Sequence, residues 1–173
     1  MDEVFQSRLK AKEDLAVALA YEVANNPEVQ AAFAARDRER LIELTLPAYQ
    51  VIDAQFDMPQ SQFHLAPATS FLRLHGLEQY GDDLSSFRFT VLAANAEKRA
   101  VSGVEIGRGG LGVRGVVPVT YQGRHIGTVE FGPNVDLTMI EELKNEFGVD
   151  WQILLERNAA EIATFQGVVG ETQ

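Results

Sequence analysis

Two arginines, Arg73 and Arg88, stand where the hydrophobic pattern of the chain predicts side chains that face a core. Arg88 falls on the apolar stripe of an expected helix, and Arg73 alternates along an expected strand with Phe71 and His75. A guanidinium in such a place needs an anionic partner, because an unpaired buried charge is very costly. Its planar fork matches a carboxylate with two parallel hydrogen bonds. If the strand face meets the helix, the two arginines converge and could hold a small organic anion.

Internal ion pairs are the competing explanation for these arginines. Either guanidinium could pair with Asp82, Asp83, Glu105 or Glu130 and simply hold the fold together. Arg114 lies on a strand face and is a weaker candidate for either role. The sequence leaves both explanations open.

The candidate ligand site lies between the strands at 63–75, the helix that carries Arg88, and the faces of later strands. The two guanidinium groups would bind the anion, a histidine and a serine would add hydrogen bonds, and aromatic rings would supply the apolar wall that such pockets need. The predicted ligand is a small organic anion such as a short carboxylate, with an amino acid as the next class. The predicted ligand-binding residues are His64, Ser70, Phe71, Arg73, Phe87, Arg88, Tyr121 and Glu130.

A glycine-rich run matches the dinucleotide-binding pattern G-x-G-x-x-G at Gly107, Gly109 and Gly112. The Rossmann fingerprint requires a helix after the glycines, whose N-terminus holds the pyrophosphate. A strand pattern follows here, so nucleotide binding is rejected. The run is either a flexible connection or a glycine loop that lets the backbone approach a ligand.

Neither a metal site nor a nucleophile stands out. The histidines, His64, His75 and His125, lack metal-ligand spacing, and one is expected to line a pocket while the other two lie at the surface. The serines lack a G-x-S-x-G elbow. Asp82 and Asp83 stand where a helix N-cap is expected. The sequence therefore predicts no catalytic residue, no metal, no cofactor and no enzymatic activity.

Charge and composition restrict the partners. The 173-residue chain has 25 acidic and 15 basic residues and a formal net charge of −10. That balance argues against nucleic acid and against an anionic membrane surface. The chain has no cysteine, which excludes disulfides and thiolate sites without deciding the compartment. No apolar run reaches the length of about 18 residues that spans a bilayer.

Hydrophobic periodicity predicts an α+β fold. A PAS-like antiparallel sheet is expected, with a long N-terminal helix over 2–25 and covering helices at 84–97 and 136–147. Gln122-Gly123 suits a tight hairpin. The expected helical region is 1–58, the PAS-like sheet module 59–157 and the exit segment 158–173. The remaining expected elements are helices at 27–35 and 38–55, the second kinked or restarted at Pro47, and strands at 63–65, 70–74, 101–106, 113–121, 125–131 and 151–155.

Four segments together carry a family resemblance: FHLAPATSFLRLH, GDDLSSFR, GLGVRGVVPV and HIGTVEFG. The combination resembles the extracytoplasmic Cache sensor domains of bacterial chemoreceptors and sensor kinases, and is most similar to the double-Cache subgroup with an FHLPPATSFLR-like segment. It covers roughly residues 25–155. Ala66 stands where that subgroup would have a second proline.

The resemblance implies a ligand-binding sensor domain of a transmembrane chemoreceptor or sensor kinase, located in the periplasm. A small molecule would bind between the sheet and its covering helices, and terminal helices would pass the signal to the membrane. The N-terminal helix could also support a homodimer. The alternative is a cytosolic PAS-like interaction domain or a small soluble enzyme.

Overall fold

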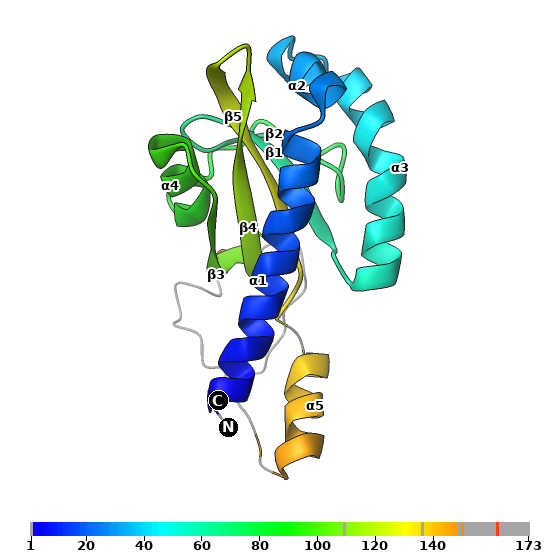
Figure 1. Cartoon of the computed structure of the whole chain (residues 1–173), viewed down its shortest axis with the longest axis vertical. Coiled ribbons are helices and arrows are strands. Elements are labelled where there is room, and N and C mark those ends of the chain that lie inside the picture. Colours follow the sequence, from blue (N-terminus) through cyan, green and yellow to red (C-terminus); the bar gives the residue numbers. More distant parts are fainter. Residues whose placement is uncertain (1, 109, 136, 149, 151–161, 163–173) are drawn as a thin grey trace.

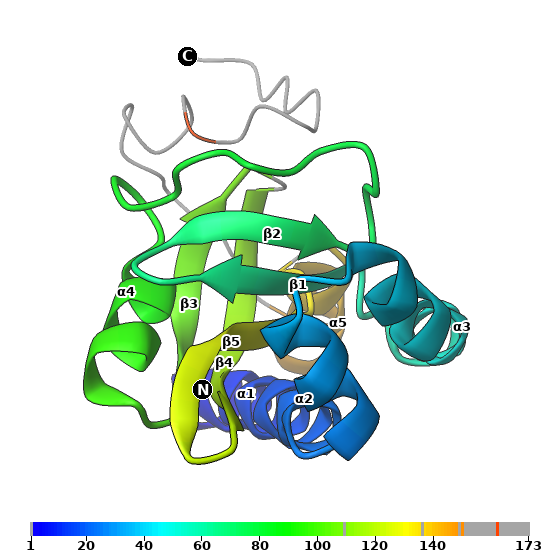
Figure 2. The ribbon, with the colours of Figure 1, turned by 90° about the horizontal axis from the view of Figure 1, so that it is seen from above.

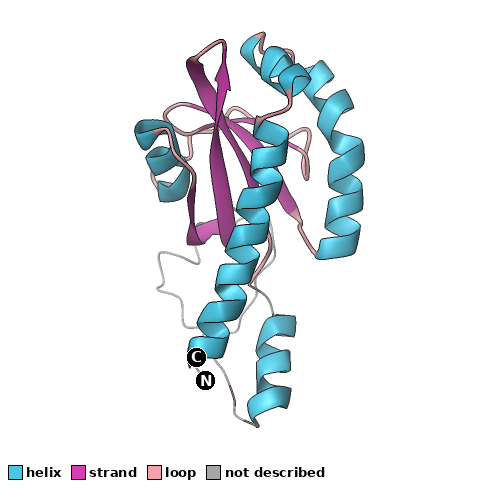
Figure 3. Cartoon of the chain, in the orientation of Figure 1, coloured by secondary structure: helices cyan, strands magenta, loops and turns pink. Residues whose placement is uncertain are grey.

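A five-stranded antiparallel sheet forms the centre of the protein (Figures 1 and 3). The computed structural model describes residues 2–108, 110–135, 137–148, 150 and 162. The strand order is β2-β1-β5-β4-β3, and all neighbours run antiparallel, as the sequence predicts. The strands are β1 (Gln60–Leu65), β2 (Thr69–Arg73), β3 (Val101–Gly107), β4 (Gly110–Tyr121) and β5 (Arg124–Gly132).

Three helices precede the sheet, α1 (Asp2–Ala24), α2 (Pro27–Ala34) and α3 (Arg38–Phe56). The side chain of Asn26 accepts hydrogen bonds at the start of α2, and Asp37 caps α3. These three predicted helices are confirmed. The helix α3 continues through Pro47, so it does not restart there, and the kink expected as the alternative stays a prediction.

The two faces of the sheet differ in what covers them (Figure 2). One face packs against the N-terminal helices through an apolar cluster that includes Ala16, Ala20 and Phe33. The opposite face meets α4 (Phe89–Glu97) and the turn before it, through a smaller cluster that contains Leu84 and Val91. The small alanine side chains let α1 lie close to the strands.

The α4 helix begins at Phe89, so the predicted start at 84 is wrong. Backbone hydrogen bonds hold the preceding segment along β2 and its turn: Ser70 N–H donates to Asp82 O at 3.0 Å, and Leu84 N–H donates to Ala68 O at 2.8 Å. Between Leu84 and Arg88 the chain forms only a turn, in which Arg88 N–H donates to Leu84 O at 2.9 Å. Asp83 therefore caps a local turn, accepting from Ser85 N–H at 2.9 Å, and does not cap the helix.

A β-bulge in the first hairpin corrects the predicted alternation of β2. Phe63 pairs with Leu72 but His64 pairs with Ser70, so Phe71 is the extra residue. The bulge turns Phe71 to the face of Phe63, where its ring centroid lies 5.5 Å from that of Phe33. Phe71 and Arg73 consequently do not share a face.

The C-terminal helix α5 (Leu137–Phe147) does not cover the sheet as predicted. It lies beside the N-terminal part of α1 (Figure 1), where Arg8 pairs with Glu142 at 3.4 Å and with Glu146. Phe147 packs near Leu9. The long helix α1 occupies the sheet face instead. The predicted strand at 151–155 and nearly all of the predicted exit segment lie outside the described residues, and the predicted domain boundaries stay predictions.

The β4–β5 hairpin confirms the predicted turn. Gln122 and Gly123 both have positive φ angles, 50° and 75°. A two-residue hairpin turn requires such angles if it is to match the right-handed twist of the two strands. This hairpin projects at the end of the molecule opposite the N-terminus (Figure 1).

Contact between α1 and the sheet depends on Gly115. A Cβ atom there would lie 2.5 Å from Val17 N and 2.6 Å from Ala16 C, both backbone atoms of α1. We therefore expect Gly115→Ala to lower the free energy of unfolding by about 2 kcal/mol or more, because the helix must move away. Gly103→Ala is the matched control, since nothing lies within 4 Å of that Cβ position. Equal urea midpoints for the two variants would contradict the close packing.

Candidate ligand-binding site

A buried carboxylate, Glu130, lies at the middle of the central strand β5. Its side chain has a relative exposure of 1%. Gln62 of β1 and Val116 of β4 are its cross-strand neighbours. Cross-strand partners and alternate residues share a sheet face. On this register the face towards α4 carries a set of polar side chains: Gln60, Gln62, His64, Ser70, Arg73, Glu105, Arg114, Thr128 and Glu130.

Arg88 connects α4 to this polar face. Its Nε donates to Glu105 Oε2 at 2.8 Å, and its Nη2 donates to Glu130 Oε2. Burial opposes the charged form of Arg88, but the two carboxylates outweigh burial and raise its pKa above the usual value. Glu105 also accepts from Thr90 N–H at 2.9 Å, and so caps the first turn of α4. The partner that the sequence required for Arg88 is thus supplied from within the protein.

Arg114 lies in a cradle of glycines. It donates to Gln60 Oε1 at 2.5 Å and lies 3.7 Å from Glu130 Oε1. Burial, with the neighbouring charge of Arg88, lowers its pKa to about 10, so it stays charged at neutral pH. Added Cβ atoms would come within 2.6–3.1 Å of its guanidinium at three positions, Gly107, Gly112 and Gly132.

The cradle accounts for two glycines of the glycine-rich run, Gly107 and Gly112. The glycines make room for a buried arginine. Sequence reasoning underrated Arg114, and the signal that could have found it is that these glycines lie around it in the strand register.

Asp82 bridges two arginines at the edge of the cleft. Arg73 Nη2 donates to Asp82 Oδ2 at 2.9 Å, and Arg73 Nη1 lies 2.8 Å from Oδ1. Arg108 Nε donates to the same carboxylate at 2.9 Å. Burial opposes ionisation of Asp82, but these arginines hold its pKa below the usual value. The Asp82 side chain remains 28% exposed, unlike that of Glu130. A carboxylate held by a two-armed guanidinium is the arrangement that the sequence predicted for a ligand.

A narrow cleft lies between these groups. It has a volume of about 10 Å³, the room of roughly one water molecule. Its apolar wall is formed by Leu84 and Phe87. The lining residues are Gln60, Gln62, Arg73, His75, Leu84, Phe87, Arg88 and Arg108.

Two histidines lie on this face, the buried His64 and the more exposed His75, and His125 lines another pocket, which corrects the expectation that one histidine would line a pocket and two would lie at the surface. His64 Nδ1 lies 3.1 Å from Thr128 Oγ1, and His75 Nδ1 lies 3.1 Å from Ser61 O. Burial lowers the pKa of both, and nearby arginines add to the effect. Both rings are therefore neutral at neutral pH. Within the described part of the chain, no cluster of three or more potential ligands could hold a metal ion.

Four buried polar atoms beside the cleft have no hydrogen-bond partner among the described residues. They are His64 Nε2, Asp82 Oδ1, Glu130 Oε1 and Arg114 Nε. Buried polar groups are normally satisfied, by protein or by ordered water or ligand. The centre of this face can therefore accept further hydrogen-bonding atoms.

The structure brings together six of the eight predicted site residues. Ser70 joins them by accepting from Gln62 Nε2 at 2.8 Å. Phe71 lies on the other face of the sheet, and Tyr121 lies at the end of β4, where it lines a separate pocket. Gln60, Gln62, His75, Glu105, Arg108 and Arg114 complete the site beyond those predicted.

Residues 2–170 match the family model of the double sensory domain of two-component sensor kinases. The chain belongs to this family. The family consists of sensory domains, and the expectation that this domain is not an enzyme agrees with that. A search of curated proteins gave no significant match. None of the described helices is both long and apolar enough to cross a membrane.

Solved sensor domains share the fold. The sensor domain of E. coli DcuS is 17% identical, with a TM-score of 0.57 over 79% of this chain and 97% of that one. The V. cholerae histidine kinase DctB sensor domain is 11% identical, with a TM-score of 0.56 over 78% of this chain. This chain covers 53% of the DctB sensor domain, about half its length. The Cache-like sensor fold predicted from sequence is thereby confirmed.

Removing Arg88 should strongly destabilise the domain. Arg88→Ala leaves Glu130 buried without its closest cation, and we expect a loss of about 3–5 kcal/mol in the free energy of unfolding. Arg40→Ala removes two exposed ion pairs, with Glu28 and Glu43, and should lose at most about 1 kcal/mol. Chemical denaturation of both variants measures the difference. A loss for Arg88→Ala as small as that for Arg40→Ala would show that the buried pairs do not hold the fold.

Acid should destabilise the domain through His75. Burial lowers its pKa from 6.5 to about 4, so the unfolded chain takes up a proton at higher pH than the folded one. This stability is present above pH 6.5 and is lost as pH falls towards 4. We expect His75→Gln to lose less stability than the wild type between pH 7 and pH 4.5 in urea titrations. His125→Gln, at a half-buried position, is the control, and an unchanged slope in His75→Gln would refute the assignment.

Proposed function

We propose that this domain is the extracytoplasmic, periplasmic ligand-binding part of a membrane-anchored sensor kinase or chemoreceptor, and that it binds a small organic anion in the cleft beside α4. One observation carries the proposal: Arg73 already holds a carboxylate, that of Asp82, at the open edge of the cleft. Family membership supports the sensory role. A short carboxylate is the favoured ligand, and an amino acid is the next class.

The charge balance around the cleft favours an anion. The guanidinium groups there are Arg73, Arg88, Arg108 and Arg114, against the carboxylates of Asp82, Glu105 and Glu130. Four cations thus face three anions, and the rings of His64 and His75 are neutral. A ligand carboxylate that replaces Asp82 would keep this balance, whereas a cationic ligand would increase the excess of positive charge.

The cleft is too small for a ligand unless a protein group leaves. Asp82 is the group best placed to do so, because it is partly exposed and lies in the loop between β2 and α4, whereas Glu130 and Glu105 are buried. A ligand carboxylate can take over the two guanidinium contacts of Asp82. The rest of the ligand would then lie against Leu84 and Phe87.

Release of Asp82 offers a route for the signal. Asp82 O accepts the backbone N–H of Ser70, so the loop is coupled to β2. Glu130 lies on β5, which leads towards α5, and α5 is ion-paired with α1 through Arg8. The start of α1 and the helix α5 lie at the same end of the molecule (Figure 1), where both could continue the signal towards a membrane. A homodimer through α1 would fit this arrangement.

Binding of short carboxylates to Arg73 variants tests the proposal. We expect one or more members of a panel of mono- and dicarboxylates to raise the melting temperature of the wild type, and Arg73→Gln to weaken binding at least about tenfold, because a bidentate charged contact is lost. Arg99→Gln is the control, since Arg99 is an exposed arginine paired with Glu97. Binding that Arg73→Gln leaves unchanged, or a wild type that responds to no anion and no amino acid, would contradict the proposal.

A further inference from the structure

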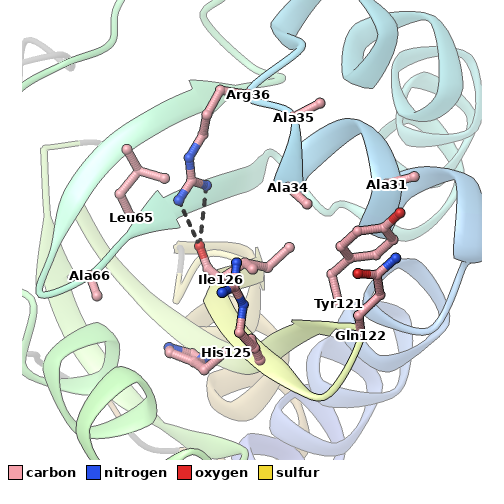
Figure 4. Close-up of a pocket in the computed structure, with 11 residues that line it drawn as sticks. Ala31, Ala34, Ala35, Arg36, Leu65, Ala66, Tyr121, Gln122, His125 and Ile126 are labelled. Atoms are coloured by element: carbon pink, nitrogen blue, oxygen red, sulfur yellow. Dashed lines mark hydrogen bonds between the residues drawn. The ribbon is translucent and has the colours of Figure 1, made fainter.

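A second pocket lies on the other side of the sheet edge, between the C-terminal end of α2, the β1–β2 turn and the β4–β5 hairpin (Figure 4). Its volume is about 770 Å³, within the range of small-molecule sites. We propose that this hairpin pocket binds a second small anion, a carboxylate with an aromatic or branched apolar part. The proposal does not depend on the ligand of the α4 cleft.

The charges of the hairpin pocket are all of one sign. Arg36 and Arg124 line it as cations, beside the imidazole of His125 whose pKa is lowered by burial, and none of its lining residues is acidic. The chain as a whole has a net charge of −10, so a pocket without carboxylates departs from the composition. A concave site with basic groups on a low-dielectric wall concentrates anions.

Arg36 is held in place by neutral groups. Its Nη1 and Nη2 both donate to Ile126 O at 3.2 Å (Figure 4). Nη1 also donates to Phe33 O at 3.2 Å. Its guanidinium carbon lies 5.1 Å from the ring centroid of Phe33 and 5.9 Å from that of Phe71. Burial lowers the pKa of Arg36. Among the described residues no carboxylate forms an ion pair with Arg36 that would raise this pKa again. The guanidinium is thus fixed and partly desolvated, and its charge is available to a ligand.

His125 adds a second polar group. Its Nε2 lies 2.8 Å from Asn95 Oδ1, and because that oxygen can only accept, Nε2 carries the proton. The Asn95 amide nitrogen donates to Pro67 O at 3.1 Å, which fixes the orientation of the amide. His125 Nδ1 is buried and has no hydrogen-bond partner among the described residues. Burial, with the neighbouring charge of Lys98, lowers the pKa of His125, so Nδ1 becomes a donor only when a bound anion stabilises the protonated ring.

The apolar part of the pocket defines the rest of the ligand. Ala31, Ala34, Leu65 and Ile126 form hydrocarbon walls, and Tyr121 supplies an aromatic ring. This gives Tyr121, which lies away from the α4 cleft, a place in a binding site. An aromatic carboxylate such as benzoate presents one charge and one flat apolar surface, and is the probe that fits both features.

Amide-resolved NMR titration of the whole domain with benzoate tests the proposal. We expect saturable shifts at Tyr121, Gln122 and His125. Arg36→Gln and the exposed-site variant Arg124→Gln should each weaken binding at these residues, by about tenfold for Arg36→Gln, and Arg73→Gln should not. Benzamide, the uncharged analogue, should bind at least about tenfold more weakly.

Several results would overturn the proposal. Absence of saturable shifts at these residues, equal affinity for benzoate and benzamide, or wild-type affinity in both Arg36→Gln and Arg124→Gln would each do so. Loss of the shifts in Arg73→Gln would assign benzoate to the α4 cleft instead. Because the hairpin-pocket resonances and variants are separate from those of the cleft, either proposal can fail without the other.

Discussion

The requirement to neutralise Glu130 determines much of this structure. A carboxylate with almost no solvent contact, at the centre of a sheet, can remain ionised only if cations and donors reach it. Arg88 reaches it from the start of α4, and Arg114 reaches it from β4. Arg114 fits only because Gly107, Gly112 and Gly132 leave space for it. Glu105 then shares Arg88 and also caps α4, so one charge network fixes both a helix and a strand face.

The same network makes one sheet face polar and the other apolar. The apolar face packs against α1 and α2 and supplies most of the core. The polar face is closed by α4 and the loop that carries Asp82, with space for about one water. Arg73 and Arg88, the two arginines that the sequence analysis assigned to the anion site, are each bound to an internal carboxylate in this state. A ligand must therefore compete with the protein, which is a way to couple binding to movement of the loop.

Local patterns predicted most of the fold. Asn26 and Asp37 marked helix starts, and Gln122-Gly123 marked the hairpin, because these signals depend on neighbouring backbone alone. The sequence also indicated that Arg88 needs an anionic partner, and Glu105 and Glu130 were among the predicted partners. It left open whether such pairing or ligand binding explained the arginine.

Features set by distant contacts could not be read from the sequence. The helix α4 starts at Phe89 and not at the predicted residue 84, after a loop whose backbone pairs with β2 and its turn. The bulge at Phe71 reversed one side chain, and nothing in the local alternation marks it. The sequence analysis underrated Arg114 because the glycines around it lie on three strands, β3, β4 and β5, and only the strand register shows that they are neighbours. The packing of α5 against α1 likewise depends on Arg8, more than 130 residues earlier.

The central claim is that Asp82 occupies the position of the ligand carboxylate, and the affinity of Asp82→Asn for short carboxylates tests it most directly. Isothermal titration of the variant and the wild type, with Asp83→Asn as the control, gives the comparison. The Asp83 carboxylate contacts Ser85 in a local turn, so its loss should leave affinity unchanged. If Asp82 is an internal competitor, Asp82→Asn binds the carboxylate several-fold more tightly than the wild type, on the order of tenfold. Affinity that falls or stays the same in Asp82→Asn would contradict the account.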